Sequence, residues 1–331
     1  MSDMNVLMQL VQADIERIDS TMLDDLEKLA VKLDGRLVEI LRYGLLGGGK
    51  RFRPLLTVIS SRLSGGSSEE IYNLSIAFEY LHLATLFHDD IIDRAETRRG
   101  KPSVCKAYGI AAAILAGDFL HSRAMEVIGR LGGEQALEIF CGATEAIVDG
   151  EFVQLRNAEN FNQSEADYFR AIEGKTALLI SAATEIGALF GGADRNQQQA
   201  LREYGRNLGY GFQIVDDLLD YRGEESATGK STGNDLCEGK MTLPLILALE
   251  QADQSGRNTI IEILADPETR GKSFNSVYNF IERHEGFSRA ESRAQRCIED
   301  ALHNLRVFPA YKDKDIRILQ GLAQYALQRK K

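Results

Sequence analysis

Apolar residues recur at helical spacing along almost the whole chain, and this pattern most constrains the fold. In the segment 71–93 the apolar and small positions are Ile71, Leu74, Ala77, Phe78, Leu81, Ala84, Thr85 and His88. Positions i, i+3, i+4 and i+7 share one face of an α-helix, whereas a half-buried strand alternates at every second residue. Strand-like alternation is scarce, so the chain is predicted to be all-α.

The same spacing of apolar residues, called the apolar ladder below, predicts further helices over 37–46, 111–128, 136–153, 166–189, 197–219, 290–305 and 316–326. Clusters of Gly, Ser and Pro separate them, as at Gly47–Gly49 and Gly132–Gly133, and such clusters end helices. The breaks lie about 20–30 residues apart, which implies long helices. Because no low-complexity linker divides the chain, the sequence predicts one domain over residues 1–331, folded as a single bundle.

Composition narrows the class of protein. A net charge of −10 argues against a nucleic-acid partner, which needs a basic face, but allows small phosphorylated substrates. The four cysteines are scattered without a C-x-x-C pair, which favours a reducing compartment. The first residues lack the basic start of a signal peptide, and no apolar run approaches a membrane span. We therefore expect a cytoplasmic protein without a transmembrane segment.

Two copies of D-D-x-x-D are the most informative motifs. The first is Asp89–Asp93 and the second is Asp216–Asp220, each at the C-terminal end of an apolar ladder. The outer aspartates of each copy share a helix face, where their like charges repel and the helix dipole favours cations. A solvated acidic helix end would explain one copy, but two copies favour a bound cation. Magnesium fits because it takes oxygen ligands, keeps several waters and is bridged by phosphates. The middle aspartates point about 100° away, so we expect them to support this face.

Lysine and arginine residues follow the same segments. Gly44–Lys50 satisfies G-x-x-x-x-G-K, but position 51 is not Ser or Thr and the preceding residues look helical, so a P-loop is rejected. Instead, the glycines end one helix and a proline begins the next, which lets Lys50 and Arg53 project into the gap. Arg98 and Arg99 follow the first motif and suit bidentate contacts with phosphate. Each cation alone is more often a surface charge, so the prediction of a diphosphate site rests on their clustering.

Further polar residues complete this set. Lys175, Thr176, Lys230 and Lys240 are additional candidates for phosphate contacts. His82 lies two helical turns before the first motif, where it is either a satisfied core histidine or a donor to a phosphate oxygen.

Together these motifs resemble the trans-prenyl (polyprenyl) diphosphate synthase family, most closely its bacterial long-chain octaprenyl type. The matching stretches are Gly47–Pro54 (GGGKRFRP), His82–Ser103, Gly117–Phe119, Asp149–Leu155, Gly174–Thr176 and Gly211–Leu245. The resemblance implies long antiparallel helices around a central cavity, as in isoprenoid synthases, usually in a homodimer. It also implies several magnesium ions in each active site.

The resemblance also assigns roles by position. Isopentenyl diphosphate would be held by Lys50, Arg53, His82 and Arg99. Magnesium would be bound by Asp89, Asp93 and Asp216. The allylic diphosphate or its metal ions would contact Arg98, Lys175, Thr176, Gln213, Lys230 and Lys240. The residues expected to act in the chemical step are Asp89, Asp93, Arg98, Lys175, Gln213 and Asp216.

The implied reaction lengthens an allylic diphosphate, farnesyl or geranylgeranyl, by repeated addition of isopentenyl diphosphate. Ala84 and Thr85 lie five and four residues before Asp89. Short-chain members of the family carry aromatic residues there, which form a floor that closes the cavity below the growing product. Small residues there favour a long all-trans product, of the octaprenyl class used in quinone side chains. They can equally serve helix packing, so a farnesyl or geranylgeranyl product is the alternative.

Other classes of protein remain open. A class I terpene cyclase shares an aspartate motif but needs no isopentenyl site. An HD-type metal phosphohydrolase is suggested by His88 and Asp89, although His121, His284 and His303 show no supporting spacing. An inactive partner subunit of a heteromeric synthase would be expected to lose the aspartates. Contact with a membrane is expected only transiently, at the surface, during product release.

Overall fold

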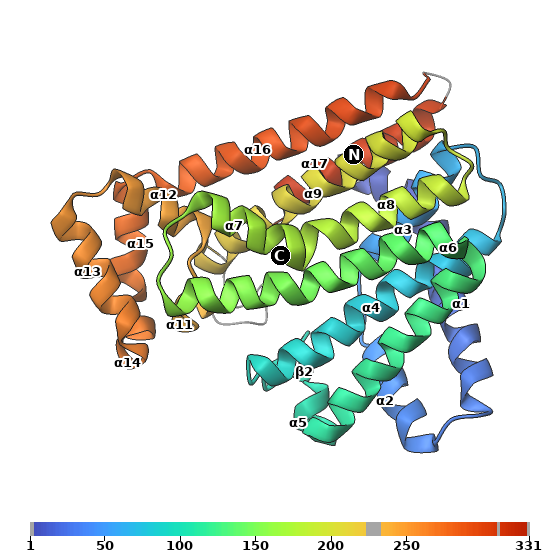
Figure 1. Ribbon diagram of the computed structural model, residues 1–331, viewed down its shortest axis with the longest axis horizontal. Coiled ribbons are helices and arrows are strands. Elements are labelled where there is room, and N and C mark those ends of the chain that lie inside the picture. Colours follow the sequence, from blue (N-terminus) through green and yellow to red (C-terminus); the bar gives the residue numbers. More distant parts are fainter. Residues whose placement is uncertain (1–2, 223–232, 310–311, 330–331) are drawn as a thin grey trace. The chain divides into compact units, whose positions relative to one another are not determined.

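The computed structural model describes residues 3–222, 233–309 and 312–329 (Figure 1). The first helices and strands are α1 (Asp3–Ala30), α2 (Gly35–Leu45), α3 (Phe52–Leu63), α4 (Glu70–Ile92), β1 (Thr97–Arg98), β2 (Lys101–Pro102), α5 (Val104–Tyr108), α6 (Ile110–Glu159) and α7 (Glu165–Ile172). They are followed by α8 (Leu178–Phe190), α9 (Arg195–Arg222), α11 (Asn234–Cys237), α12 (Leu243–Gln251), α13 (Gln254–Ala265), α14 (Pro267–Arg270), α15 (Phe274–Arg283), α16 (Gly286–Asn304) and α17 (Asp313–Gln328). The all-α prediction is confirmed.

The predicted break at Gly132–Gly133 is confirmed: the predicted helices 111–128 and 136–153 lie on either side of Gly133, whose φ of 77° interrupts α6. Two details differ from the helices expected from the sequence. The predicted helix 166–189 is divided, because a π-helix, Glu173–Ala177, lies between α7 and α8. After α4, β1 and β2 form a short antiparallel hairpin in which Arg98 pairs with Lys101. Strands of two residues are too short to show alternation.

Side-chain caps fix the start of several helices. Asp34 accepts a hydrogen bond from the Arg36 amide at 2.9 Å before α2. Ser164 accepts one from the Asp167 amide at 3.2 Å before α7. Each cap satisfies one of the N–H groups that a helix leaves without an internal partner.

The chain forms two compact units. Unit 1 comprises Met1–Gly142, Ala182–Arg202 and Val307–Gly321, and unit 2 comprises Ala143–Ser181, Glu203–Arg306 and Leu322–Lys331. The prediction of a single domain over residues 1–331 stays a prediction. In unit 1, α3 packs on α4, and Phe78 of α4 meets Phe140 of α6 edge to face, with ring centres 5.5 Å apart.

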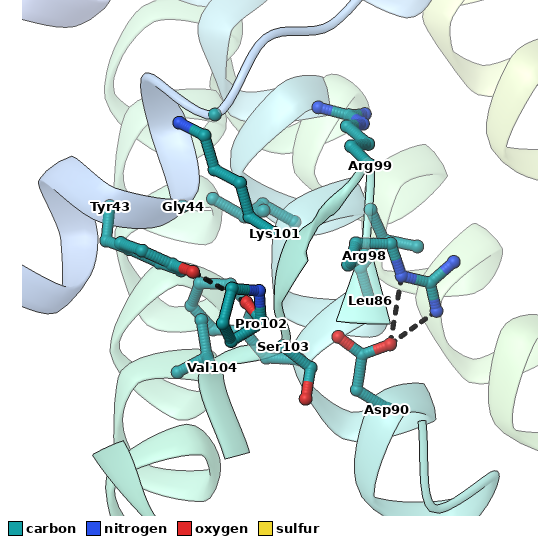
Figure 2. A pocket seen from close by; sticks show the side chains of 13 residues that line it. Tyr43, Gly44, Leu86, Asp90, Arg98, Arg99, Lys101, Pro102, Ser103 and Val104 are labelled. Carbon is teal, nitrogen blue, oxygen red and sulfur yellow. Dashed lines mark hydrogen bonds and ion pairs between the residues drawn. The ribbon is translucent and has the colours of Figure 1, made fainter. Parts of the chain in front are cut away.

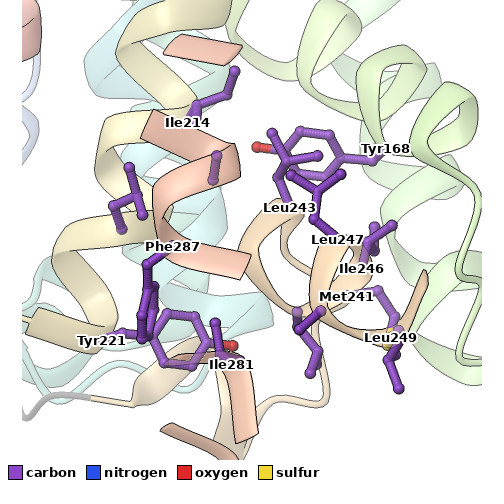
Figure 3. Packing of buried hydrophobic residues seen from close by; sticks show 14 of the residues in the cluster. Tyr168, Ile214, Tyr221, Met241, Leu243, Ile246, Leu247, Leu249, Ile281 and Phe287 are labelled. Carbon is purple, nitrogen blue, oxygen red and sulfur yellow. The ribbon is translucent and has the colours of Figure 1, made fainter. Parts of the chain in front are cut away.

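The core of unit 2 is built around α12, and most of its apolar residues are completely buried (Figure 3). Helix α16 packs closely on α12, because Gly286 leaves no room for a side chain beside the Pro244 carbonyl. The short helices α13 and α14 pack together, and α15 packs on α12. None of the helices in the described part of the chain combines the length and apolar composition that a membrane span needs.

Candidate functional site

Arg51 organises the glycine-rich loop between α2 and α3. It caps α3 in the left-handed region, with φ 48°, and its side chain is only 5% exposed. Its Nε donates to Asp19 at 2.6 Å, Nη1 donates to Glu79 at 2.8 Å and Nη2 donates to the Leu45 carbonyl at 2.8 Å. Burial alone would lower the pKa of Arg51, but the charges and hydrogen bonds of the two carboxylates raise it. The loop is therefore anchored by one buried, fully charged guanidinium.

The loop also contacts the β1–β2 hairpin. Arg99 donates to the carbonyl of Gly48. A side chain at Gly49 would come within 3.2 Å of Arg99 Nη1 and of Glu79, and 2.7 Å from Arg51 Nη1. A side chain at this position would therefore displace charged groups that pack against the loop backbone. The two sequence stretches that carry Lys50 and Arg99 lie side by side in unit 1.

His82, on α4, lies within this group of cations. Burial lowers the pKa of His82 well below its usual value, and the charges of Arg53, Arg99, Arg98 and Arg51 lower it further. The imidazole is therefore neutral at physiological pH. Four guanidinium groups surround this neutral donor, two of them in the ion pairs of Arg51 with Glu79 and of Arg98 with Asp90. A cluster of cations and neutral donors is what an anion site requires.

The first aspartate motif occupies the last turn of α4. Asp89 is partly buried, Asp90 is buried and Asp93 is exposed. Asp90 accepts a hydrogen bond from Arg98 Nε at 2.9 Å and a second from the same guanidinium (Figure 2). The middle carboxylate thus orients Arg98, while the outer aspartates on the other face stay accessible to solvent.

A pocket next to this ion pair is also shown in Figure 2. Its apolar wall includes Leu83 and Phe87, and its rim carries Arg98, Arg99 and Lys101. Tyr43 closes one side and donates to the Pro102 carbonyl at 2.6 Å. The rim shares its arginines with the cation group, so the pocket belongs to the same part of unit 1.

The two candidate chain-length residues differ in exposure. Ala84 is 2% exposed and packed, whereas Thr85 is partly exposed. The Thr85 hydroxyl donates to the His82 carbonyl at 2.8 Å, within its own helix. An added side chain at Thr85 therefore displaces fewer packed neighbours than one at Ala84.

The second aspartate motif lies on α9 in unit 2 and repeats this division of roles. The Asp216 side chain is 43% exposed, whereas Asp217 is buried. Tyr168 donates to Asp217 at 2.6 Å, and Gln213 Nε2 donates to it at 3.0 Å. Thr176 in turn donates to Gln213 Oε1 at 2.9 Å. This chain of hydrogen bonds joins the second motif to the predicted phosphate-binding Thr176.

The second motif is crowded with negative charge. Burial raises the pKa of both Asp217 and Asp220, and the neighbouring Asp235 raises them further. Lys240 lies 3.4 Å from Asp235 and also pairs with Glu238. One of the predicted cations is therefore near the motif, and Lys230 lies outside the described residues.

Lys175 is carried by the π-helix between α7 and α8. Its Nζ lies 2.6 Å from Glu151 of α6. A side chain at Gly150 of α6 would come 2.7 Å from the Lys175 amide and 3.0 Å from the backbone carbon of Gly174. The two backbones touch through glycines, and π-helical turns of this kind often occur at functional sites.

The carboxylate oxygens of the two aspartate motifs are suitable ligands for a hard divalent metal ion. Each motif presents accessible carboxylate oxygens, which are ligands that magnesium prefers. Within residues 3–222, 233–309 and 312–329, no three His, Cys, Asp or Glu side chains gather into a complete metal site. The chain's own groups would therefore supply only part of the coordination of an ion.

Comparison with known proteins gives a consistent result. The family model described as polyprenyl synthetase matches residues 34–281. An octaprenyl diphosphate synthase of Haemophilus influenzae is 34% identical over 312 residues, which cover 94% of this chain and 93% of that protein. A geranylgeranyl diphosphate synthase of Saccharolobus solfataricus is 36% identical over 291 residues, covering 86% and 87%.

A solved structure is similar to this chain in both sequence and fold. The polyprenyl synthase of Caulobacter crescentus CB15, complexed with calcium and isoprenyl diphosphate, aligns with a TM-score of 0.90. It is 34% identical and covers 98% of this chain and 97% of its own. The predicted isoprenoid-synthase fold and the prediction of an enzyme are confirmed, and the phosphohydrolase and inactive-subunit alternatives are set aside. The chain belongs to the polyprenyl synthetase family and is a trans-prenyl diphosphate synthase, a prenyltransferase.

Proposed function

We propose that the chain condenses isopentenyl diphosphate head-to-tail with farnesyl or geranylgeranyl diphosphate and makes a long all-trans product, octaprenyl diphosphate, for quinone side chains. The observation that carries the proposal is the group of guanidinium ions around neutral His82, directly beside the first aspartate motif. It is suited to a diphosphate that is held but not cleaved. The proposal treats residues 1–331 as one catalytic domain of a cytoplasmic enzyme.

We assign each group of predicted site residues to one of the two substrates. Lys50, Arg53, His82 and Arg99 hold isopentenyl diphosphate and aim its double bond. Arg98 is kept in position by Asp90 and binds the allylic diphosphate or its metal ions. In unit 2, Lys175, Thr176, Gln213 and Lys240 bind the allylic diphosphate, together with Lys230. The cations stabilise the charge of the departing diphosphate, whose oxygens then take up the proton lost by the new product.

Magnesium is the proposed metal, with Asp89, Asp93 and Asp216 as its protein ligands. When bound, it supplies Lewis-acid stabilisation of the leaving diphosphate. Waters and phosphate oxygens would complete its coordination, in keeping with the partial donor sets described above.

We also propose that the chain forms a homodimer through α6. Ile110, Ile114 and Leu115 are exposed near the start of this helix, and Val148, Phe152 and Leu155 are exposed near its end. The last three lie at spacings of four and three residues, which is one helical face. Exposed apolar helix faces of this kind mark contacts with a partner.

The test is to incubate the purified protein with magnesium chloride, farnesyl diphosphate and labelled isopentenyl diphosphate, and to size the products. A ladder that ends at eight five-carbon units supports the full proposal. A ladder that stops at four units supports the geranylgeranyl alternative and refutes the octaprenyl product. No incorporation with any allylic primer refutes the reaction.

A variant pair tests the cation group. Arg53→Gln should raise KM for isopentenyl diphosphate at least tenfold, the effect of one lost charge-assisted hydrogen bond, with little change in KM for the primer. The matched control is Arg36→Gln, because Arg36 is exposed at the start of α2 in the same unit. Equal changes in the two variants would show that only the overall charge matters.

A further inference from the structure

The residue that follows α17 places a guanidinium on the second aspartate motif. One nitrogen of Arg329, Nη2, donates to Asp216 Oδ1 at 2.8 Å and to the Phe212 carbonyl at 2.9 Å. The guanidinium carbon lies 3.5 Å from the centre of the Phe212 ring, so the cation lies over the aromatic face. The Arg329 side chain is only 6% exposed. All three residues belong to unit 2.

Each aspartate of this motif has a different partner. Asp217 accepts hydrogen bonds from neutral side chains, and Asp220 accepts one from the backbone amide of Asp235 at 3.1 Å. The Asp216 side chain is 43% exposed, and its described ion pair is with Arg329. The carboxylate proposed to bind magnesium is thus already paired with a cation of the chain itself.

We propose that Arg329 is an exchangeable counter-cation of the second motif. It pairs with Asp216 while no divalent ion is bound, and it leaves this carboxylate when the ion binds. A guanidinium and a divalent ion repel each other at such short range, and they compete for the same negative charge. This inference rests on the proposed function, because it takes Asp216 to be a metal ligand.

The geometry couples this exchange to the end of α17. Phe212 and Asp216 are four residues apart on α9, so they present one face to the guanidinium. One guanidinium thus contacts the Asp216 carboxylate, the Phe212 carbonyl and the Phe212 ring at once. We infer that its release from Asp216 also moves it off the Phe212 ring. Binding of the ion is thus expected to change the position of Arg329, which follows α17.

The first test is isothermal titration calorimetry of the full chain with Mn²⁺ alone, an ion that shares the oxygen ligands of magnesium. Arg329→Gln removes the competing cation, so it should bind Mn²⁺ about fivefold more tightly, the effect of one partly exposed ion pair. Arg317→Gln is the matched control, since Arg317 forms an exposed ion pair with Asp313 on the same helix. Its affinity should not change. When Asp216→Asn is added to both the parent chain and the Arg329→Gln variant, the difference in affinity between them should disappear.

The outcomes separate the two proposals. Equal or weaker Mn²⁺ binding by Arg329→Gln, with binding still dependent on Asp216, overturns the exchange and leaves the metal site intact. No heat of binding in any variant, with Mn²⁺ alone and again in the presence of inorganic pyrophosphate, whose oxygens can complete the coordination, refutes the proposed metal site, and the exchange with it.

The second test reports directly on the guanidinium. The chain contains no tryptophan, so Phe212→Trp introduces a single tryptophan beneath Arg329, which can be excited apart from the 11 tyrosines. Titration with magnesium chloride should change its emission as the stacked cation leaves. The double variant Phe212→Trp, Arg329→Gln should show no such change. The same change in both backgrounds would contradict the exchange.

Discussion

Replacing Glu79 by alanine is expected to destabilise unit 1 strongly. The change removes one of the two carboxylates that contact the buried Arg51 guanidinium. The Glu79 side chain is 7% exposed and that of Arg51 is 5% exposed, so water cannot replace the lost partner. Breaking a buried pair by removing one partner costs about 3–5 kcal/mol. We expect about 3 kcal/mol, because Asp19 and the Leu45 carbonyl still accept hydrogen bonds.

The same guanidinium supplies its own control. Asp19 also pairs with Arg51, at 2.6 Å, but its side chain is 45% exposed. Since solvent screens such a pair, Asp19→Ala should cost at most about 1 kcal/mol. Urea unfolding followed by far-ultraviolet circular dichroism measures both free energies, compared at equal slope. Equal losses in the two variants would refute the argument that burial of the carboxylate decides the effect.

Three further predictions concern α4 and the π-helix. Burial and neighbouring cations hold the pKa of His82 well below its usual value near 6.5. Below pH 6.5 the unfolded chain binds a proton at His82 that the folded chain does not. The free energy of unfolding should therefore decrease as the pH is lowered, by up to about 1.4 kcal/mol per pH unit. Urea midpoints between pH 7 and 5 should show a smaller loss in His82→Gln. Thr85→Phe should shorten the longest product without stopping the first condensation, as measured by chromatography of labelled products; an unchanged length would contradict the floor argument. Gly150→Ala should displace the Lys175 backbone, cost about 1–3 kcal/mol and lower kcat. Gly142→Ala, on the same helix with no atom within 4 Å, should do neither in the same assays.

The parts of the fold that local sequence determines were predictable. The apolar ladder of α4 and the acidic motif at its end lie within one helix, so their spacing alone predicts a shared face. The glycine pair at 132–133 was enough to predict the interruption of α6, but the π-helix at Glu173–Ala177 was not predicted, since the apolar spacing continues through it. Hydrophobic periodicity records which face is buried, and one extra residue in a turn changes it too little to be recognised.

The contacts that hold the site together were mostly not predictable. Arg51 and Glu79 are far apart in sequence, and the only local signal is a charged residue between Phe78 and Tyr80 in a buried run. Tyr168 and Glu151 likewise reach their partners only through the packing of different helices. Glu151 lies in the matching stretch Asp149–Leu155, but neither that stretch nor the sequence around Tyr168 indicates which side chain each residue contacts.

The acidic end of α4 has a consequence for how the protein persists in a cell. Asp89 and Asp93 repel each other one turn apart, at the helix end where the dipole is also negative. Divalent ions bound there, as proposed above, would relieve this repulsion, and because they need the folded helix they would add to the free energy of unfolding. The protein without ligand would then open more readily, and a protease, which acts on the opened chain, would digest it faster than the protein with ligand.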